Sequence, residues 1–197
     1  MMSTDARLPT PLIAAFRHQE AREGFEVVSV TVGPASVRVH GQTAAVEDGQ
    51  PWSVRYVITL DQAWHTRHAE VWGLSATGER NVITEIDGSG RWRVNGDLRP
   101  DLAGCLDVDL ESSACTNTIP VHRMGLSVGE EAEAPAVYIR AVDLTVERLE
   151  QTYRRLPSDD GRQRYDYRAP VFDFEGRLVY DEAGLLLDYP GIASRAY

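Results

Sequence analysis

The chain of 197 residues is long enough to bury one large hydrophobic core, and we expect residues 1–197 to form a single domain. Its 30 acidic and 20 basic residues give a formal net charge of -10, which opposes binding to nucleic acid and to anionic lipid surfaces. All the basic residues are Arg, so Schiff-base chemistry and P-loop lysine chemistry are excluded.

The N-terminal segment lacks the pattern of a leader or a membrane anchor. Residues 1–22, which we expect to be flexible, contain only a short apolar run at 12–16. A secretory leader needs about 7–15 apolar residues, and a membrane span needs roughly 20. The sequence therefore predicts a cytoplasmic protein without integral membrane association. In that compartment Cys105 and Cys115 are expected to be buried thiols.

Alternating apolar and polar residues predict three neighbouring antiparallel strands in the first third of the chain. Residues 25–32 form the first of them and end at Gly33-Pro34. The second follows at 35–40, where Val37 and Val39 lie opposite Arg38 and His40. The third, at 52–61, places five apolar side chains on one face, namely Trp52, Val54, Tyr56, Ile58 and Leu60. Such strands are half-buried.

The next segments are mixed in character. Residues 64–77 place Trp64 and Trp72 on the same face as His68 and Glu70, a pattern typical of a cavity wall. Residues 81–87 and 91–95 flank Gly88-Ser89-Gly90, which indicates a tight hairpin.

The C-terminal half continues the β pattern. The acidic stretch 129–135 is interpreted as an exposed loop. Residues 141–156 fit both a helical and a strand period, and we favour a strand. Phe172 and Phe174, then Glu175-Gly176, then two further apolar pairs separated by a turn at 181–184, describe a meander. Roughly ten strands with little helix predict a mainly β domain, either a barrel or a strongly curved sheet.

The stretch 90–123 concentrates rigid, hydrogen-bonding and ionisable residues and is the candidate site. Asp107 and Asp109 are two residues apart, so in a strand they face one side, where they share a proton, hold a cation or bind sugar hydroxyls. The alternative is a pair of solvated acids at a strand edge. Residues 116–118 fit either a structural turn or a site for ligand hydroxyls. For Arg123 we favour a structural ion pair with Asp107 or Asp109.

No metal or cofactor is expected at this stretch. The spacing of Cys105, Cys115 and His122 matches no zinc motif. Residues 96–104 lack a dinucleotide-binding fingerprint. Trp and Tyr side chains outnumber the four Phe, and rings with a polar tip suit sugar or amphiphilic ligands, although they also fill cores.

Four segments carry a resemblance to a known family. They are W-x-V-N-G-x-x-x-P-D-L-x-G-C-L-D-V-D-L at 92–110, T-N-T-I-P-V-H-R at 116–123, R-Y-D-Y-R at 164–168 and D-E-A-G-L-L-L-D-Y-P at 181–190. In this order they resemble the bacterial family described as "putative glycolipid-binding", first defined as a domain of unknown function. The resemblance implies an incomplete β-barrel, a curved antiparallel sheet similar to the half-barrels of envelope lipoprotein carriers. It implies no catalytic residues.

Three hypotheses follow for the function. The first is a non-enzymatic protein that holds a glycolipid or other amphiphile on a curved sheet, with Val54, Tyr56 and Ile58 against the tail. The residues expected to contact the ligand are Tyr56, Trp92, Asn95, Asp107, Asp109, Thr116, Asn117, Arg123 and Tyr167. The second is a small-molecule hydrolase or isomerase that uses Asp107 or Asp109 as acid or base and Arg123 or Asn117 to stabilise charge. The third is an interaction module that forms a homo-oligomer.

Overall fold

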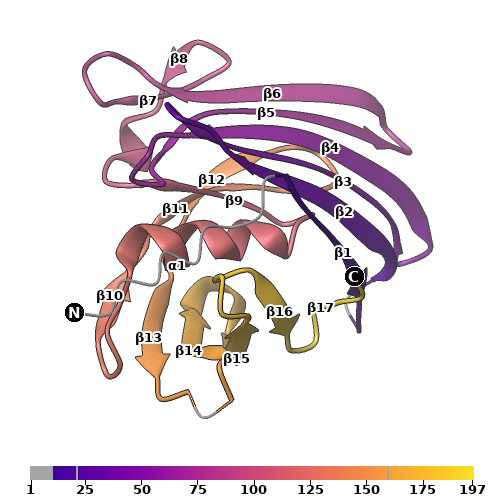
Figure 1. Ribbon diagram of the computed structural model, residues 1–197. Helices are drawn as coiled ribbons and strands as arrows, with labels where there is room; N and C mark the ends of the chain where they lie inside the picture. The colour runs from indigo at the N-terminus through magenta and orange to yellow at the C-terminus, as the bar shows by residue number, and fades with distance from the viewer. Residues whose placement is uncertain (1–10, 21, 159) are drawn as a thin grey trace.

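The computed structural model describes residues 11–20, 22–158 and 160–197, and nearly all of its regular structure is β (Figure 1). The strands are β1 (Leu12–His18), β2 (Glu23–Val32), β3 (Val37–Glu47), β4 (Gln50–Leu60), β5 (Thr66–Ser75), β6 (Gly78–Ile86), β7 (Trp92–Val94), β8 (Asp97–Leu98), β9 (Asp107–Leu110), β10 (Glu131–Glu133), β11 (Ala136–Ile139), β12 (Val146–Leu149), β13 (Thr152–Leu156), β14 (Gln163–Ala169), β15 (Phe174–Tyr180), β16 (Leu186–Tyr189) and β17 (Ala193–Arg195). One α-helix, α1 (Thr118–Met124), follows the 3₁₀ turn Cys115–Asn117, and two further 3₁₀ turns lie at Pro100–Leu102 and Pro170–Phe172.

A single large antiparallel sheet contains fourteen of these strands. Their order is β10-β13-β14-β15-β16-β17-β1-β2-β3-β4-β5-β6-β7-β8. Within the described residues the two end strands, β10 and β8, pair with only one neighbour each, so the sheet remains open. The predicted fold class, a mainly β protein with a curved antiparallel sheet that stops short of a barrel, is confirmed.

The alternation in β2, β3 and β4 produces the inner face of this sheet. The three strands pair in antiparallel register, with Val30 opposite Val39 and Val39 opposite Ile58. All five apolar residues predicted for one face of β4 are buried, whereas Arg55 between them is exposed. The prediction of three half-buried antiparallel strands is confirmed.

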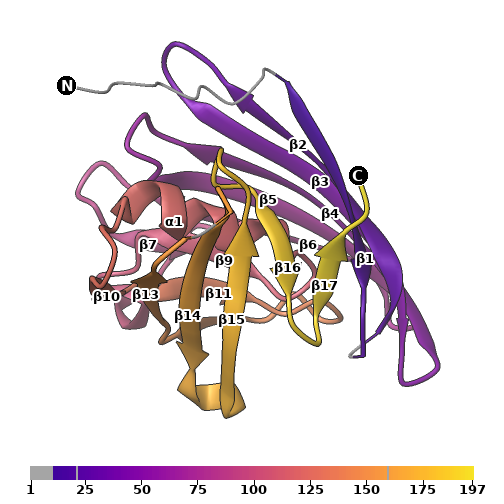
Figure 2. The same ribbon diagram turned by 60° about the horizontal axis from the view of Figure 1, so that its bottom comes forward.

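A second layer fills the hollow of the sheet. In both ribbon views α1 and the three-stranded sheet β12-β11-β9 lie inside the curve, between the long strands β1–β6 and the C-terminal strands (Figures 1 and 2). Strand β11 pairs with β9 in parallel and with β12 in antiparallel register. All four residues of β9 are buried, as are all four of β11. The inner face of the large sheet therefore packs against the chain's own central segment, which runs from β9 to β12 (residues 107–149).

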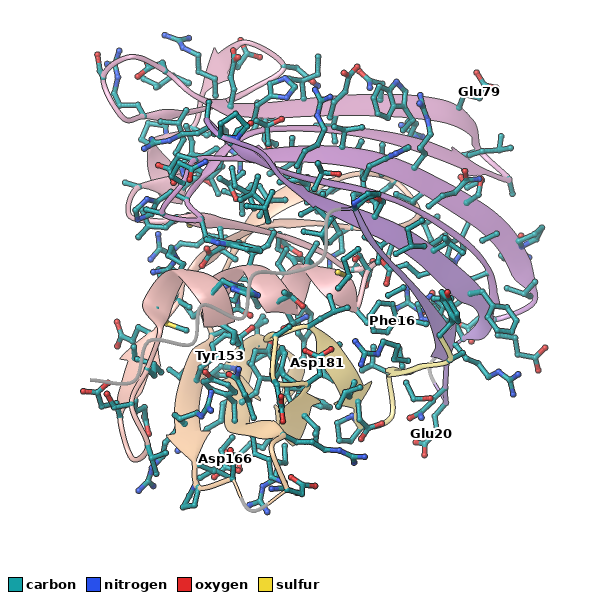
Figure 3. The ribbon with its side chains drawn as sticks, viewed as in Figure 1. Phe16, Glu20, Glu79, Tyr153, Asp166 and Asp181 are labelled. Atoms are coloured by element: carbon teal, nitrogen blue, oxygen red, sulfur yellow. The ribbon has the colours of Figure 1, made fainter. Side chains whose placement is uncertain are left out.

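The C-terminal strands run from β13 to β17, and the last of them returns to β1. Strand β17 pairs with β1, with Phe16 opposite Arg195. In Figure 3 Phe16 lies on the inner side of this junction, and Glu79 lies on the far rim of the sheet. Rings from β13 to β16 make edge and tilted contacts in the core between these strands and α1, and this tyrosine cluster comprises Tyr153, Tyr165, Tyr167, Tyr180 and Tyr189.

Two expectations about the inner face need correction. The face of β5 that carries His68, Glu70 and Trp72 is the outer one, because Ala69 and Val71 are the buried side chains. The Arg55 guanidinium carbon lies 3.9 Å from the centroid of the Trp72 ring. Trp72 therefore packs on the outer face of the sheet and does not line an interior cavity. The register irregularity between Thr59 and Leu60 opposite β5 explains why the simple alternation from Trp64 fails.

The residues expected to contact a ligand tail lie in the packed core. Val54, Tyr56 and Ile58 are at most 1% exposed. The central segment covers them, and the Tyr56 hydroxyl contacts Ser113 at 3.0 Å. A lipid tail therefore finds no room along this face of β4, and this part of the expectation is wrong.

Three further segments differ from the sequence prediction. The acidic stretch 129–135 contains the edge strand β10, whose exposed Glu side chains suit an unpaired sheet edge. Residues 141–156 are strand and not helix, as favoured, but they form two strands in different sheets, β12 and β13. Of the N-terminal residues expected to be flexible, Leu12–His18 forms β1 inside the sheet, and residues 1–10 lie outside the described residues.

Short strands account for the larger number of elements. The described residues hold seventeen strands instead of roughly ten. Several of these span two to four residues, too few for an alternating pattern to identify. The hairpin at 88–90 is confirmed, since Ile86 pairs with Trp92 across it. The turn at 181–184 is also confirmed, whereas Glu175 and Gly176 lie within β15.

Candidate functional site

A cavity of about 230 Å³ lies where the central segment meets the C-terminal strands. One wall comes from β9 and the turn after it, and the opposite wall from β14, β15 and β16. Its aromatic lining is Tyr138, Tyr167, Phe172, Phe174 and Tyr189. Its polar lining is Arg22, Asp109, Glu111, Ser113, Asn117 and Arg140. An apolar cavity with a few convergent polar groups is the usual form of a small-molecule site.

The aromatic rings hold one another in place. Tyr189 makes edge contacts with Tyr167 and Phe174, with centroid distances of 5.8 and 5.5 Å. At the mouth Phe172 tilts against Tyr138 at 5.4 Å, and the Arg140 guanidinium lies over both rings. Edge and tilted contacts of this kind stabilise ring pairs beyond simple burial. The cavity therefore presents preformed ring surfaces to a ligand.

Asp109 is the carboxyl group of the cavity whose pKa is raised towards neutral pH. Its carboxylate accepts a hydrogen bond from Thr116 Oγ1 at 2.9 Å and has no cationic partner among the described residues. Burial raises the pKa of Asp109 to about 6, and the nearby charges of Asp107 and Glu111 act in the same direction. A cavity carboxyl with such a pKa exchanges a proton close to neutral pH.

The arginines of the cavity are already paired. Arg140 donates to Glu147 at 2.6 Å and to Glu111 at 3.4 Å. Arg22 donates to the Glu111 carbonyl at 3.0 Å, and its Nε lies 3.6 Å from Glu47. Because each guanidinium has a carboxylate nearby, the cavity offers no surplus positive charge. It suits neutral polar groups better than a phosphate.

Only part of the predicted site residues line this cavity, namely Asp109, Asn117 and Tyr167. Thr116 lies behind Asp109 as its hydrogen-bond donor. The Asn117 amide oxygen accepts from the Tyr153 hydroxyl at 2.7 Å, and Tyr153 lies below α1 in Figure 3. The Tyr167 hydroxyl donates to Gln151 at 2.9 Å.

The other predicted residues lie elsewhere and have structural partners. The Tyr56 hydroxyl donates to Glu26 at 2.5 Å in the core. Trp92 Nε1 donates to the Cys105 carbonyl at 2.9 Å, and the Asn95 side chain accepts from the Ile83 backbone in a turn. Asp107 and Arg123 pair with each other through two hydrogen bonds of 2.8 and 2.7 Å. These five residues do not line the cavity.

The sequence does not indicate that several of the cavity residues belong to a site. Phe172 and Phe174 were recognised only as strand residues, and Arg22 and Arg140 lie in segments without any motif. The one sequence signal was the excess of tyrosine, since Tyr138 and Tyr189 belong to the group with polar tips. No pattern in the chain indicates that these residues meet, because the distances along the sequence are large.

The comparisons with known proteins agree with this fold. The profile of a family described as "Putative glycolipid-binding" matches residues 14–195. The chain belongs to this family. A crystal structure of a DUF1089 family protein from Pseudomonas aeruginosa is similar at 32% identity, covering 98% of this chain and 97% of that one, with a TM-score of 0.73. No curated protein matches the sequence.

Metal-binding clusters and membrane-spanning helices are both absent from the described residues of this family member. No group of three His, Cys, Asp or Glu side chains in that part of the chain is arranged to bind a metal ion. Likewise, no helix there has the length and apolar character that a bilayer crossing requires.

Asp109→Asn is expected to gain stability relative to the unmodified protein as the pH rises. The folded-state pKa of about 6 lies above the ordinary 3.8, so the folded state favours protonated Asp109. The contribution of protonated Asp109 to the free energy of unfolding is therefore full below the ordinary pKa of 3.8 and is lost as the pH rises through 6. The variant does not ionise there, so its advantage grows by about 2 kcal/mol between pH 4 and pH 7.

Urea denaturation of both proteins at pH 4 and pH 7 measures this change. The matched control is Asp101→Asn at an exposed carboxylate that pairs with Arg99. It should show no such gain. An Asp109→Asn variant whose relative stability is the same at both pH values would mean that the carboxylate is solvated in the folded protein.

Proposed function

We propose that this protein binds a glycolipid or similar amphiphile without converting it, and that the cavity receives the ligand's sugar-like polar head. The observation that carries the proposal is the combination, in one cavity, of five aromatic rings with uncharged and charge-balanced polar groups. Ring faces pack against the C–H surfaces of a sugar, and the side chains of Asp109 and Asn117 hydrogen-bond its hydroxyls.

The size of the cavity limits what enters it. Its volume of about 230 Å³ is below the roughly 300 Å³ at the lower end for drug-sized ligands, so it suits a single ring and not a whole lipid. The tail must then leave through the mouth. Phe172 lines the cavity and is 40% exposed, and its neighbour in the chain, Val171, is 69% exposed. The tail lies along this rim and not on the covered inner face of the large sheet.

Native mass spectrometry of gently purified protein is expected to show a co-purifying glycolipid or related amphiphile. Phe172→Ala should weaken binding of that ligand about three- to tenfold, because one ring contact of the rim is lost. The matched control is Phe25→Ala, since Phe25 is 51% exposed on β2, outside the cavity, and should leave the affinity unchanged. Protein that carries no ligand and fails to bind a panel of amphiphiles would defeat the proposal.

A second candidate function is favoured by the state of Asp109. A buried carboxyl with a pKa of about 6 in a cavity is the form of a general acid or base. Of the other residues expected for this role, Asp107 and Arg123 are held by each other. Catalysis would therefore rest on Asp109 with Asn117. If the protein is an enzyme, Asp109→Asn lowers turnover of the co-purified ligand by about a hundredfold or more. If it is a carrier, neither protein produces any product.

A further inference from the structure

We propose that a second cavity, at the C-terminal end of α1, binds an oxyanion group such as phosphate, sulfate or carboxylate. This cavity has a volume of about 270 Å³ and lies between α1, β13, β14 and the turn after β15. It shares no lining residue with the first cavity. The inference therefore does not depend on the function proposed for the first cavity.

Arg155 provides the main argument. Its Nη1 donates to Gln163 Oε1 and to the Tyr165 hydroxyl, the latter at 2.7 Å. Its Nε is buried without a hydrogen-bond partner, and no carboxylate of the described residues pairs with it. A buried polar atom that lacks a partner costs free energy unless water or a ligand satisfies it. Arg155 thus has an unused hydrogen-bonding edge at the cavity.

Other arginines of this protein show what that edge binds. In the pairs Arg67–Asp61, Arg99–Asp101 and Arg123–Asp107, one or both carboxylate oxygens accept from the Nε and Nη2 atoms of the guanidinium. This planar fork matches the geometry of carboxylate and phosphate. In the described part of the chain the same edge of Arg155 makes no hydrogen bond. An oxyanion from a ligand would complete it.

His122 adds a second unsatisfied group on the same cavity. Its Nε2 is buried without a partner. The imidazole stacks flat on the Trp64 indole, with a centroid distance of 3.9 Å and an interplanar angle of 6°. Trp64 adopts a φ of 64°, which is rare and costly for a bulky residue. The chain therefore accepts backbone strain in the arrangement that fixes the plane of this imidazole.

Gly184 keeps the space in front of His122 open. A Cβ at this position would lie 3.0 Å from His122 Nε2, and the φ of 79° disfavours any side chain there. The Tyr165 hydroxyl accepts from Arg155, and its own hydrogen is not used in any hydrogen bond between described residues. Arg155 and Tyr165 therefore offer two donors to this space, and His122 Nε2 adds a third polar atom that donates in one tautomer of the neutral imidazole.

The charge around this cavity differs from the rest of the molecule. Its lining contains Arg155 and His122 and no Asp or Glu. Four other hollows in the described part of the chain each include at least one acidic residue. The Asp181 carboxylate near His122 is held by Arg195 at 2.7 Å and by the Leu185 amide at 2.9 Å. Burial lowers the pKa of His122 to about 4, so its imidazole is neutral near pH 7 and Arg155 supplies the positive charge of this lining. In a chain of net charge -10, a hollow lined by an arginine and no carboxylate suits an anion.

Isothermal titration calorimetry at low ionic strength, with inorganic phosphate, sulfate and acetate in separate arms, tests the site. We expect saturable binding of at least one anion with one site per chain. Arg155→Gln should weaken it at least tenfold. The matched control is Arg154→Gln, because Arg154 is the preceding residue of β13, is exposed and carries the same charge. It should change the affinity less than twofold. Comparing phosphate and sulfate with acetate also shows whether the site prefers a tetrahedral or a planar anion.

A second readout covers the case in which Arg155→Gln does not fold. In the unmodified protein the NMR signal of the Arg155 Nε–H should shift on titration with the bound anion. Tyr165→Phe, which removes one hydroxyl, should weaken binding about threefold. The proposal is overturned if none of the three anions binds, if Arg154→Gln weakens binding as much as Arg155→Gln, or if the Nε–H signal does not move at saturation.

Discussion

Glu26→Ala is expected to lower the free energy of unfolding by about 4 kcal/mol or more, a large share of the 5–15 kcal/mol typical of a folded protein. Glu26 is on the inner face of β2 and is fully buried. Its carboxylate accepts hydrogen bonds from the Tyr56 hydroxyl, the Ser113 hydroxyl and the backbone amides of Ala114 and Cys115. Removing the carboxylate takes the acceptor from four buried donors, of which only the Tyr56 and Ser113 hydroxyls have each other as an alternative partner. Urea denaturation at pH 7 measures the loss.

The matched control lies on the same strand. Glu23→Ala removes an equally charged but exposed side chain from β2 and should change stability by less than about 0.5 kcal/mol. Burial raises the pKa of Glu26, so its charged form is disfavoured in the folded protein. Because the folded-state pKa lies above the ordinary value, the associated stability is full at low pH and falls as the pH rises through that pKa. A small loss in Glu26→Ala, equal to that of Glu23→Ala, would show that this network does not anchor the central segment.

The large sheet is the part of the fold that the sequence could predict. In β2, β3 and β4 each residue has a near neighbour on the adjacent strand, and one face meets the core while the other meets solvent. Such strands leave a period of two in the sequence, as Val37 and Val39 show against Arg38 and His40. The strand pattern left open a barrel or a strongly curved sheet, and the family resemblance added that the sheet stops short of a closed barrel.

The inner layer could not be predicted, because its stability depends on contacts distant in sequence. Glu26 contacts a segment 87 to 89 residues further along the chain. The sequence does contain one hint, since Glu26 shares the inner face of β2 with Val28 and Val30. A charged residue at a core-facing position needs a buried partner. Its identity, a turn that starts at Ser113, follows only from the structure.

The candidate site could be predicted only in part, because its contacts are also distant in sequence. The spacing of Asp107 and Asp109 indicates that they share one side of a strand, but neither that both are buried nor which groups they meet. The turn after β9 brings Thr116 to Asp109, and α1 brings Arg123 to Asp107. Asp107 and Asp109 therefore have different roles although they lie two residues apart on one strand: Asp107 pairs with Arg123, and Asp109 lines the cavity. The rings of Phe172, Phe174 and Tyr189 arrive from a meander whose own pattern indicates only strands.

Asp107→Ala is expected to destabilise the protein by about 3–5 kcal/mol, because it leaves the Arg123 guanidinium buried without a partner. The pair is well shielded, since the side chain of Asp107 is 1% exposed and that of Arg123 is 11% exposed. Its two parallel hydrogen bonds connect β9 to the last turn of α1. Chemical denaturation of Asp107→Ala, Arg123→Ala and the double variant gives the interaction energy by a double-mutant cycle.

The double variant decides what the pair does. Replacing both charges removes the unpaired ion, so the double variant should be clearly more stable than the sum of the two single changes predicts. The affinity for an amphiphile should fall little in either single variant that remains folded, because neither residue lines the first cavity. Loss of binding or turnover without loss of stability would instead place Asp107 and Arg123 at the reacting centre, which is one of the alternatives that the sequence offered for an enzyme. The two outcomes are distinct, since a structural ion pair changes the unfolding transition and a catalytic pair changes the rate.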